Sequence, residues 1–503
     1  MKTKRTIWNI ISAIVMQVVI FSTSFVVKKL IIKEYGSSLN GLITSITQFL
    51  SYITLLEAGV GPVIKASLYK PLSKNDNKQI SDILYASEKF FKKLSFIFLG
   101  YVFVLTILYP LIVKSGFNYW FTFSLILIIS ISVFAEYYFG MTYKLFLQAD
   151  QKTYIVSLIQ IGGYILNLIL VLIFIYLKSD IRILKLGTSI AYIIRPIIQN
   201  VIVKKYYNID FKNCDKEYKL KQKWDGLAQH IASVVHSNTD VTVLTFFSNF
   251  DAISIYSVYS TVTNGLRQVI QSFNDSMESF FGNLLALDKK SNLESKFDNY
   301  ESLFYMLLAV IYSCSFVLIT PFVKVFTLSI EDLNYSQPIF GYLIVIGELI
   351  WAIRQPYNNL IKSAGHFKQT RVGAWIEAIT NFVISLVLVK KYGLIGVAIG
   401  TAFAMLIRTT EFIWYSNKNI LNRSNWASIK KIVTLLLEFV LIIVFSKYVI
   451  FVEYTSYLNW AINAFCVLVL SIVVVLFINL IVNRNFIKNI KFSKKINKKL
   501  EEI

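Results

Sequence analysis

Apolar runs of about twenty residues recur along the whole chain, separated by short polar segments. A helix of that length crosses the hydrocarbon core of a bilayer, and lipid favours helices because their backbone polar groups are satisfied within the segment. The pattern therefore predicts an all-α polytopic membrane protein with about fourteen transmembrane helices. The predicted spans cover residues 7–30, 38–64, 90–113, 119–143, 154–177, 184–204, 227–248, 252–284, 302–327, 338–361, 371–389, 393–416, 430–449 and 457–482.

Composition and charge support this class. Of the 503 residues, 55% are hydrophobic and 16% are charged, whereas soluble domains average about 25% charged residues. The net charge of +22 does not indicate nucleic-acid binding, because the positive residues lie in short loops between spans. With alternating spans, most Lys and Arg fall on the side of the two termini. The positive-inside rule then predicts that both termini are cytoplasmic. We expect a bacterial plasma membrane, because Lys, Ile and Asn are abundant, as in proteins from AT-rich bacterial genomes.

Ordinary catalytic and cofactor motifs are missing from the sequence. It contains no phosphate-binding P-loop, no glycine-rich dinucleotide turn and no Cys/His nucleophile pairing, so we predict a transporter rather than an enzyme, without a cofactor. Cys214, Cys314 and Cys466 have no metal-type spacing and indicate neither a disulfide framework nor a metal site. The apolar run that follows the basic N-terminus is too long for a signal peptide and is predicted to be a retained span.

The chain repeats itself. The segment from Gly187 to Arg195 matches the segment from Gly400 to Arg408 at five of nine positions, and two weaker matches precede it in the same order. An even number of spans in each copy indicates a parallel repeat, two six-helix bundles related by a pseudo-two-fold axis along the membrane normal. The predicted parts are a bundle over 1–206, a basic cytoplasmic linker over 207–225, a second bundle over 226–418, two additional helices over 419–485 and a basic tail over 486–503.

Glu57 is the first polar anomaly at membrane depth. A charged side chain facing hydrocarbon costs about 2.5–3.5 kcal/mol, so Glu57 is expected to face protein or water. Gly59, Gly61 and Pro62 follow it and are expected to loosen the helix. Glu57 is a candidate for ion coupling, and an alternative is that it only packs helices together with Lys65.

Polar residues also interrupt spans 1 and 7 at similar depths, as Ser22 and Thr23 and as the cluster that contains Asn238 and Asp240. Matched polar interruptions in the two halves of a transporter indicate its central site. We therefore take Ser22, Thr23 and Asn238 as candidate cavity residues and Asp240 as an ion-coupling candidate. Alternatively, the hydroxyl groups only form hydrogen bonds between helices.

Span 8 carries Arg267 near its middle, and span 10 carries Glu348 and Arg354. The two arginines and Lys65 are candidate substrate-binding cations, and Glu348 is a third ion-coupling candidate. An alternative is that Asp240 and Arg267 form a buried structural ion pair. No metal site is predicted.

The fourteen-span plan, the two six-span halves and the segment from Leu56 to Pro62 resemble the polysaccharide transporter family of the multidrug/oligosaccharidyl-lipid/polysaccharide (MOP) exporter superfamily. The resemblance implies two bundles in a V that open alternately, with spans 1, 2, 7 and 8 bordering the cavity. It also implies that cations hold a lipid-linked sugar's diphosphate, Arg267 first and Lys65 and Arg354 after it. Lipid II flippases carry an arginine in span 1, where this chain has Ser22 to Ser24, which argues against that substrate.

The resemblance implies translocation of polyprenyl-diphosphate-linked oligosaccharide precursors of capsule, O-antigen or cell-wall polysaccharide. The expected partners are the lipid-linked oligosaccharide, membrane lipid and other polysaccharide-assembly membrane proteins, with no nucleic acid. Two alternatives stay open. A cation-coupled multidrug antiporter would have twelve spans and an acidic cavity, and a membrane glycan polymerase or ligase would need a substantial outer loop.

Overall fold

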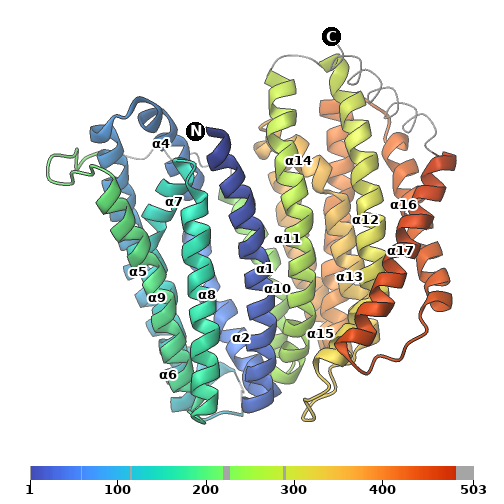
Figure 1. Ribbon diagram of the computed structural model, residues 1–503, viewed down its shortest axis with the longest axis horizontal. Helices are drawn as coiled ribbons and strands as arrows, with labels where there is room; N and C mark the ends of the chain where they lie inside the picture. The colour runs from blue at the N-terminus through green and yellow to red at the C-terminus, as the bar shows by residue number, and fades with distance from the viewer. Residues whose placement is uncertain (1, 58, 114–115, 219–226, 287–289, 483–503) are drawn as a thin grey trace. The chain divides into compact units, whose positions relative to one another are not determined.

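The computed structural model describes residues 2–57, 59–113, 116–218, 227–286 and 290–482. Over these ranges the chain is helical and contains no strand, which confirms the all-α class. The predicted basic tail and part of the predicted linker lie outside these ranges. The chain divides into two compact units, Met1–Ser257 and Val258–Ile503. Within each unit the helices run side by side as a bundle (Figure 1).

The helices of the first unit, in chain order, are α1 (Lys2–Tyr35), α2 (Ser37–Ser51), α3 (Thr54–Glu57), α4 (Val60–Lys74), α5 (Asn77–Ile112), α6 (Tyr119–Ala135), the π-helical turn η1 (Glu136–Gly140), α7 (Met141–Ala149), α8 (Thr153–Tyr176), α9 (Ile181–Tyr206) and α10 (Leu227–Phe247). The start of α11 (Phe250–Ala286) also belongs to this unit. Contacts thus group α10 with the first unit, whereas the sequence placed the start of the second bundle at residue 226. The domain bounds stay a prediction.

The second unit holds the rest of α11, α12 (Lys290–Phe326), α13 (Pro338–Ile353), α14 (Gln355–Ser363), α15 (Phe367–Ser416), the π-helical turn η3 (Asn417–Leu421), α16 (Trp426–Val449) and α17 (Tyr457–Val482). Its core is built where α13 packs on α15 and where α12 packs on α16 and α17.

Eleven helices in the described part of the chain are long and apolar enough to cross a membrane. One of these stretches, Phe367–Leu421, is 55 residues long, or about 80 Å at 1.5 Å per residue, so it is too long for a single crossing. It bends at Gly393, whose φ of 53° is not helical, and it covers two predicted spans. The polar helices α10 and α11 are not among the eleven. A multi-pass membrane protein is therefore confirmed, while the count of fourteen stays a prediction.

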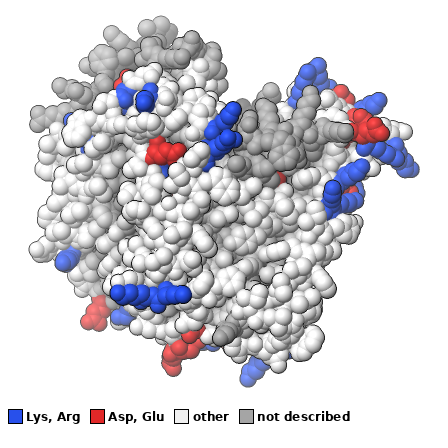
Figure 2. Space-filling view, turned by 180° about the vertical axis from the view of Figure 1, so that it is seen from behind, with Lys and Arg blue, Asp and Glu red and all other residues white. Residues whose placement is uncertain are grey.

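The surface agrees with a lipid environment. The face in Figure 2 is mostly uncharged. Large apolar side chains such as Phe103, Trp120 and Val387 are more than 60% exposed. In water such an exposed apolar surface would be unfavourable, whereas lipid hydrocarbon solvates it.

Helix interruptions occur at matched places in the two units. In the first unit the π-helical turn Glu136–Gly140 separates α6 from the nine-residue α7. In the second unit Arg354 separates α13 from α14, which also has nine residues. The separation along the chain is close to that between Gly187 and Gly400, so the interruptions follow the repeat found in the sequence.

The expected break below Glu57 is also present. Helix α3 ends at Glu57, and α4 begins at Val60 after Gly59, which adopts the left-handed conformation with φ 75°. Glycine adopts this conformation without steric cost. The carboxylate of Glu57 is thus placed at the end of a helix rather than in its middle.

Gly41 lets α2 approach the start of α11. A Cβ atom at Gly41 would lie 1.9 Å from the backbone oxygen of Phe250. We expect Gly41→Ala to lower the free energy of unfolding by about 1–3 kcal/mol, because the backbones would have to separate. Thermal unfolding of the purified protein measures this. Gly100→Ala, where a Cβ atom would meet nothing within 4 Å, is the control, and equal melting temperatures for the two variants would contradict the assignment.

Candidate functional site

Arg267 and Glu348 form a bidentate ion pair inside the second unit. Nε of Arg267 donates to Oε2 of Glu348 at 3.0 Å, and Nη2 donates to Oε1 at 2.7 Å. The guanidinium carbon also lies 4.6 Å from the ring centroid of Trp351, which is one helical turn beyond Glu348 on α13. The Glu348 side chain is 9% exposed and that of Arg267 is 26% exposed. The pair therefore presents a fixed, partly accessible cation on α11.

Arg354 lies deeper, in a second set of ion pairs. Its Nη1 is 2.5 Å from Oε1 of Glu377 on α15. Arg408 lies 3.8 Å from the other oxygen of Glu377 and donates to Glu411 at 2.6 Å. Both arginines are at least 90% buried. These ion pairs hold Arg354, the residue between α13 and α14, against α15. Arg267 is therefore the more accessible of the two candidate arginines.

A seam of neutral polar groups joins α2 and α10 in the first unit. The amide of Gln48 donates a hydrogen bond to Oδ1 of Asn238. Two pairs of hydroxyl groups extend the seam, Ser45 with Thr245 at 2.6 Å and Tyr52 with Thr242 at 2.8 Å. Neutral hydrogen bonds of this kind hold membrane helices together at about 0.6–2 kcal/mol each. The candidate Asn238 thus takes part in helix packing on this seam.

The two carboxylate candidates of the first unit each accept a hydrogen bond from a tyrosine. Asp240 is buried and accepts from the hydroxyl of Tyr256 at 3.0 Å. Glu57 accepts from the hydroxyl of Tyr137 at 3.1 Å, and Tyr137 lies in the π-helical turn η1. Such a turn shifts side chains around the helix and is frequent at functional sites. The interruption in the first unit therefore directs a hydroxyl donor to Glu57.

The remaining candidates do not converge. Ser22 is exposed, while Thr23 is buried and donates to the backbone oxygen of Val19 in its own helix at 2.6 Å. Lys65 is half-buried on α4. The structure thus brings together Arg267 with Glu348, and Glu57 with Tyr137.

Several residues of these sites were missed by the sequence analysis, namely Trp351, Glu377, Gln48 and Tyr137. The spacing of Glu348 and Trp351, three residues apart on one helix face, could have indicated a platform for a cation. A single sequence carries no comparable signal for contacts between residues on separate helices.

Several solved transporters share this architecture. A lipid II flippase, MurJ, in an inward closed conformation aligns with a TM-score of 0.72 over 96% of this chain and 100% of its own length, at 16% identity. An inward-facing multidrug resistance MATE family transporter aligns with a TM-score of 0.62 over 82% of this chain and 96% of its own, at 13% identity. The chain has the MOP transporter fold. This agrees with the fold that the resemblance implied, while membership of the polysaccharide transporter family stays a prediction.

The MOP fold includes proteins with different binding pockets. A MOP superfamily transporter from Pyrococcus furiosus aligns with a TM-score of 0.52 over 83% of this chain and 96% of its own length, at 13% identity. That transporter is described as having a binding pocket of reverse polarity, which suggests a different function. No family model matches the chain, and no curated protein matches its sequence. The substrate class therefore depends on the side chains that line the site and not on the fold.

Proposed function

We propose that this chain is a MOP-type transporter that flips polyprenyl-diphosphate-linked oligosaccharides, precursors of capsule, O-antigen or cell-wall polysaccharide, across the bacterial cytoplasmic membrane by alternating access. The observation that carries this proposal is the partly exposed guanidinium of Arg267 on α11, the helix that corresponds to the predicted eighth span. An arginine in a span is costly unless it serves a pathway or a partner. Its planar donors suit the oxygens of a diphosphate.

The extent of the structural similarity supports a lipid-linked substrate over a drug. The alignment with the lipid II flippase covers 96% of this chain, and the alignment with the MATE transporter covers 82%. Span 1 carries Ser22, Thr23 and Ser24 and no arginine in that stretch, which favours a lipid-linked sugar other than lipid II. The second candidate function, a cation-coupled multidrug antiporter, is supported by the shared fold alone.

Glu348 gives this site a way to release its substrate. The carboxylate occupies the same two guanidinium donors that a diphosphate would use. In the proposed cycle the diphosphate displaces Glu348 from Arg267 in one conformation, and Glu348 takes the guanidinium back in the other. A proton on Glu348 would favour the substrate-bound form, because a neutral acid competes less strongly for the cation.

Transport is expected to rise with the membrane potential. A diphosphate diester carries about two negative charges. Moving each charge outward across a potential of 100 mV, inside negative, lowers the free energy by about 2.3 kcal/mol. An imposed potassium diffusion potential in proteoliposomes should therefore speed transfer of a labelled polyprenyl-diphosphate oligosaccharide. Lipid II and an organic cation are tested in parallel. Export of the organic cation without glycan transfer would contradict the proposal and favour the antiporter.

A further inference from the structure

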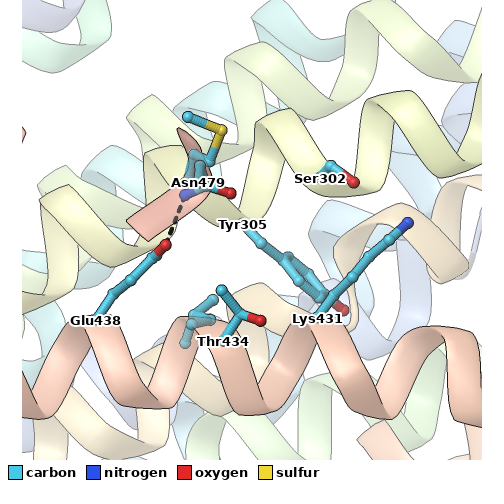
Figure 3. A pocket seen from close by; sticks show the side chains of 8 residues that line it. Ser302, Tyr305, Lys431, Thr434, Glu438 and Asn479 are labelled. Carbon is cyan, nitrogen blue, oxygen red and sulfur yellow. Dashed lines mark hydrogen bonds between the residues drawn. The ribbon is translucent and has the colours of Figure 1, made fainter. Parts of the chain in front are cut away.

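A pocket lies among α12, α16 and α17 of the second unit (Figure 3), and neither Arg267 nor Glu348 lines it. Helix α16 contributes Lys431, Thr434 and Glu438, which lie on one face because they are separated by about one turn each. Asn479 of α17 faces Glu438 across the pocket. None of these residues has a place in the proposed substrate site.

Glu438 is a buried carboxylic group with one hydrogen-bond donor. It is 1% exposed, and its Oε1 accepts from Nδ2 of Asn479 at 2.6 Å. The same amide nitrogen also donates to the backbone oxygen of Val475 at 2.8 Å. No described residue hydrogen-bonds to Oε2 of Glu438. A carboxylic group in this setting lies in the middle of an apolar membrane helix with half of its acceptor capacity unused.

The other ionisable groups around the pocket are engaged elsewhere. Nζ of Lys431 lies 2.5 Å from Oδ1 of Asp298 and 2.9 Å from Oε2 of Glu301, and it points away from Glu438 in Figure 3. The hydroxyl of Tyr305 on α12 donates to the backbone oxygen of Ile353 at 3.1 Å. Helix α17 lines the pocket with the neutral Asn479. Lys431 therefore compensates other carboxylates, and no described residue forms an ion pair with Glu438.

We propose that Glu438 is a proton-binding site in the pocket between α12, α16 and α17. A buried carboxylate that lacks a cationic partner binds either a proton or a metal ion. Among the described residues there is no group of three His, Cys, Asp or Glu side chains that could hold a metal ion, which favours the proton. Uptake forms an O–H bond at Oε2 of Glu438, and release returns the proton to water. Asn479 keeps its hydrogen bond to Oε1 in both states.

This site would give α16 and α17 a proton-exchange step of their own. The two helices lie outside the repeat that the sequence predicts, and they pack on α12. The proposal does not depend on the transported substrate, since it concerns proton occupancy of one side chain. Its test can therefore fail or succeed independently of the flippase assignment.

The experiment uses dicyclohexylcarbodiimide, an apolar reagent that adds to protonated carboxyl groups in membranes. The full-length protein in lipid vesicles is labelled between acidic and alkaline pH, and the adduct is located by peptide mass spectrometry. We expect labelling of Glu438 that falls about tenfold per pH unit above its midpoint and is absent in Glu438→Gln. Glu301 is the control within the chain, because it is fully buried but bound by Arg423 and Lys431.

Glu301 is expected to stay unlabelled at every pH. Failure to label Glu438 at any pH would overturn the proposal, and so would labelling of Glu438 that does not change with pH. Equal labelling of Glu438 and Glu301 would also overturn it, because reactivity would then report burial alone. Wild-type protein provides the pH profile, so the test holds even if Glu438→Gln does not fold.

Discussion

Arg267→Ala should reduce the transfer of a polyprenyl-diphosphate oligosaccharide by about 10-fold to 100-fold. A hydrogen bond to a charged group contributes about 1.5–3 kcal/mol, and the guanidinium is the donor that the proposal assigns to the diphosphate. The variant also leaves Glu348, whose side chain is 9% exposed, without its bidentate partner. Breaking a buried pair in this way costs about 3–5 kcal/mol of stability. Loss of transfer in this variant alone therefore has two explanations.

The double variant Arg267→Met and Glu348→Met separates them. Replacing a buried ion pair by apolar residues of similar volume is often neutral for stability. We therefore expect the double variant to unfold near the wild-type temperature and still to transfer the substrate about 10-fold to 100-fold more slowly than the wild-type protein. Arg182→Ala, at an exposed arginine paired with Asp180 at the start of α9, should transfer at the wild-type rate. A stable double variant with wild-type transfer would show that Arg267 does not bind the substrate.

Glu301→Ala should give a large loss of stability. Glu301 of α12 is fully buried and lies 2.8 Å from Nη2 of Arg423 and 2.9 Å from Nζ of Lys431, and it also accepts from the hydroxyl of Tyr357. Removing its carboxylate takes a buried ion-pair partner from both Arg423 and Lys431, which lowers the free energy of unfolding by about 3–5 kcal/mol. These contacts hold α12 to α14, to α16 and to the segment between α15 and α16.

The comparison for this loss is Asp298→Asn, since the Asp298 side chain is 46% exposed and contacts the same two cations. Water can replace much of that interaction, so the expected loss is below about 1 kcal/mol. Both losses are measured as shifts in thermal unfolding of the purified protein. A Glu301→Ala variant as stable as Asp298→Asn would show that the network does not anchor α16.

The sequence was sufficient for the class of the fold because each spanning helix carries its own signal in about twenty residues. The break after Glu57 was also predictable, since Gly59 and Pro62 act locally. The repeat found at Gly187 and Gly400 has a structural counterpart in the matched interruptions, although no residue type marks the π-helical turn at Glu136–Gly140.

The partners of the polar candidates could not be predicted, because they come from distant parts of the chain. Arg267 and Glu348 are 81 residues apart, and Tyr137 is 80 residues from Glu57. Which helix faces which is decided by packing of the whole unit, and a single sequence carries no direct signal for it. For the same reason the sequence alone does not show that Glu438 of α16 lies in a pocket with Asn479 of α17.

The most direct test of the flippase assignment is transfer itself. The purified protein is placed in vesicles with a fluorescent polyprenyl-diphosphate oligosaccharide in both leaflets, and a membrane-impermeant reductant quenches the label outside. The flippase assignment predicts that the reductant soon reaches nearly all of the label with the wild-type protein. With the Arg267→Met and Glu348→Met variant, the half in the outer leaflet is quenched at once, and the other half follows at least about 10-fold more slowly. Quenching that stops at the outer leaflet with the wild-type protein would contradict the flippase assignment.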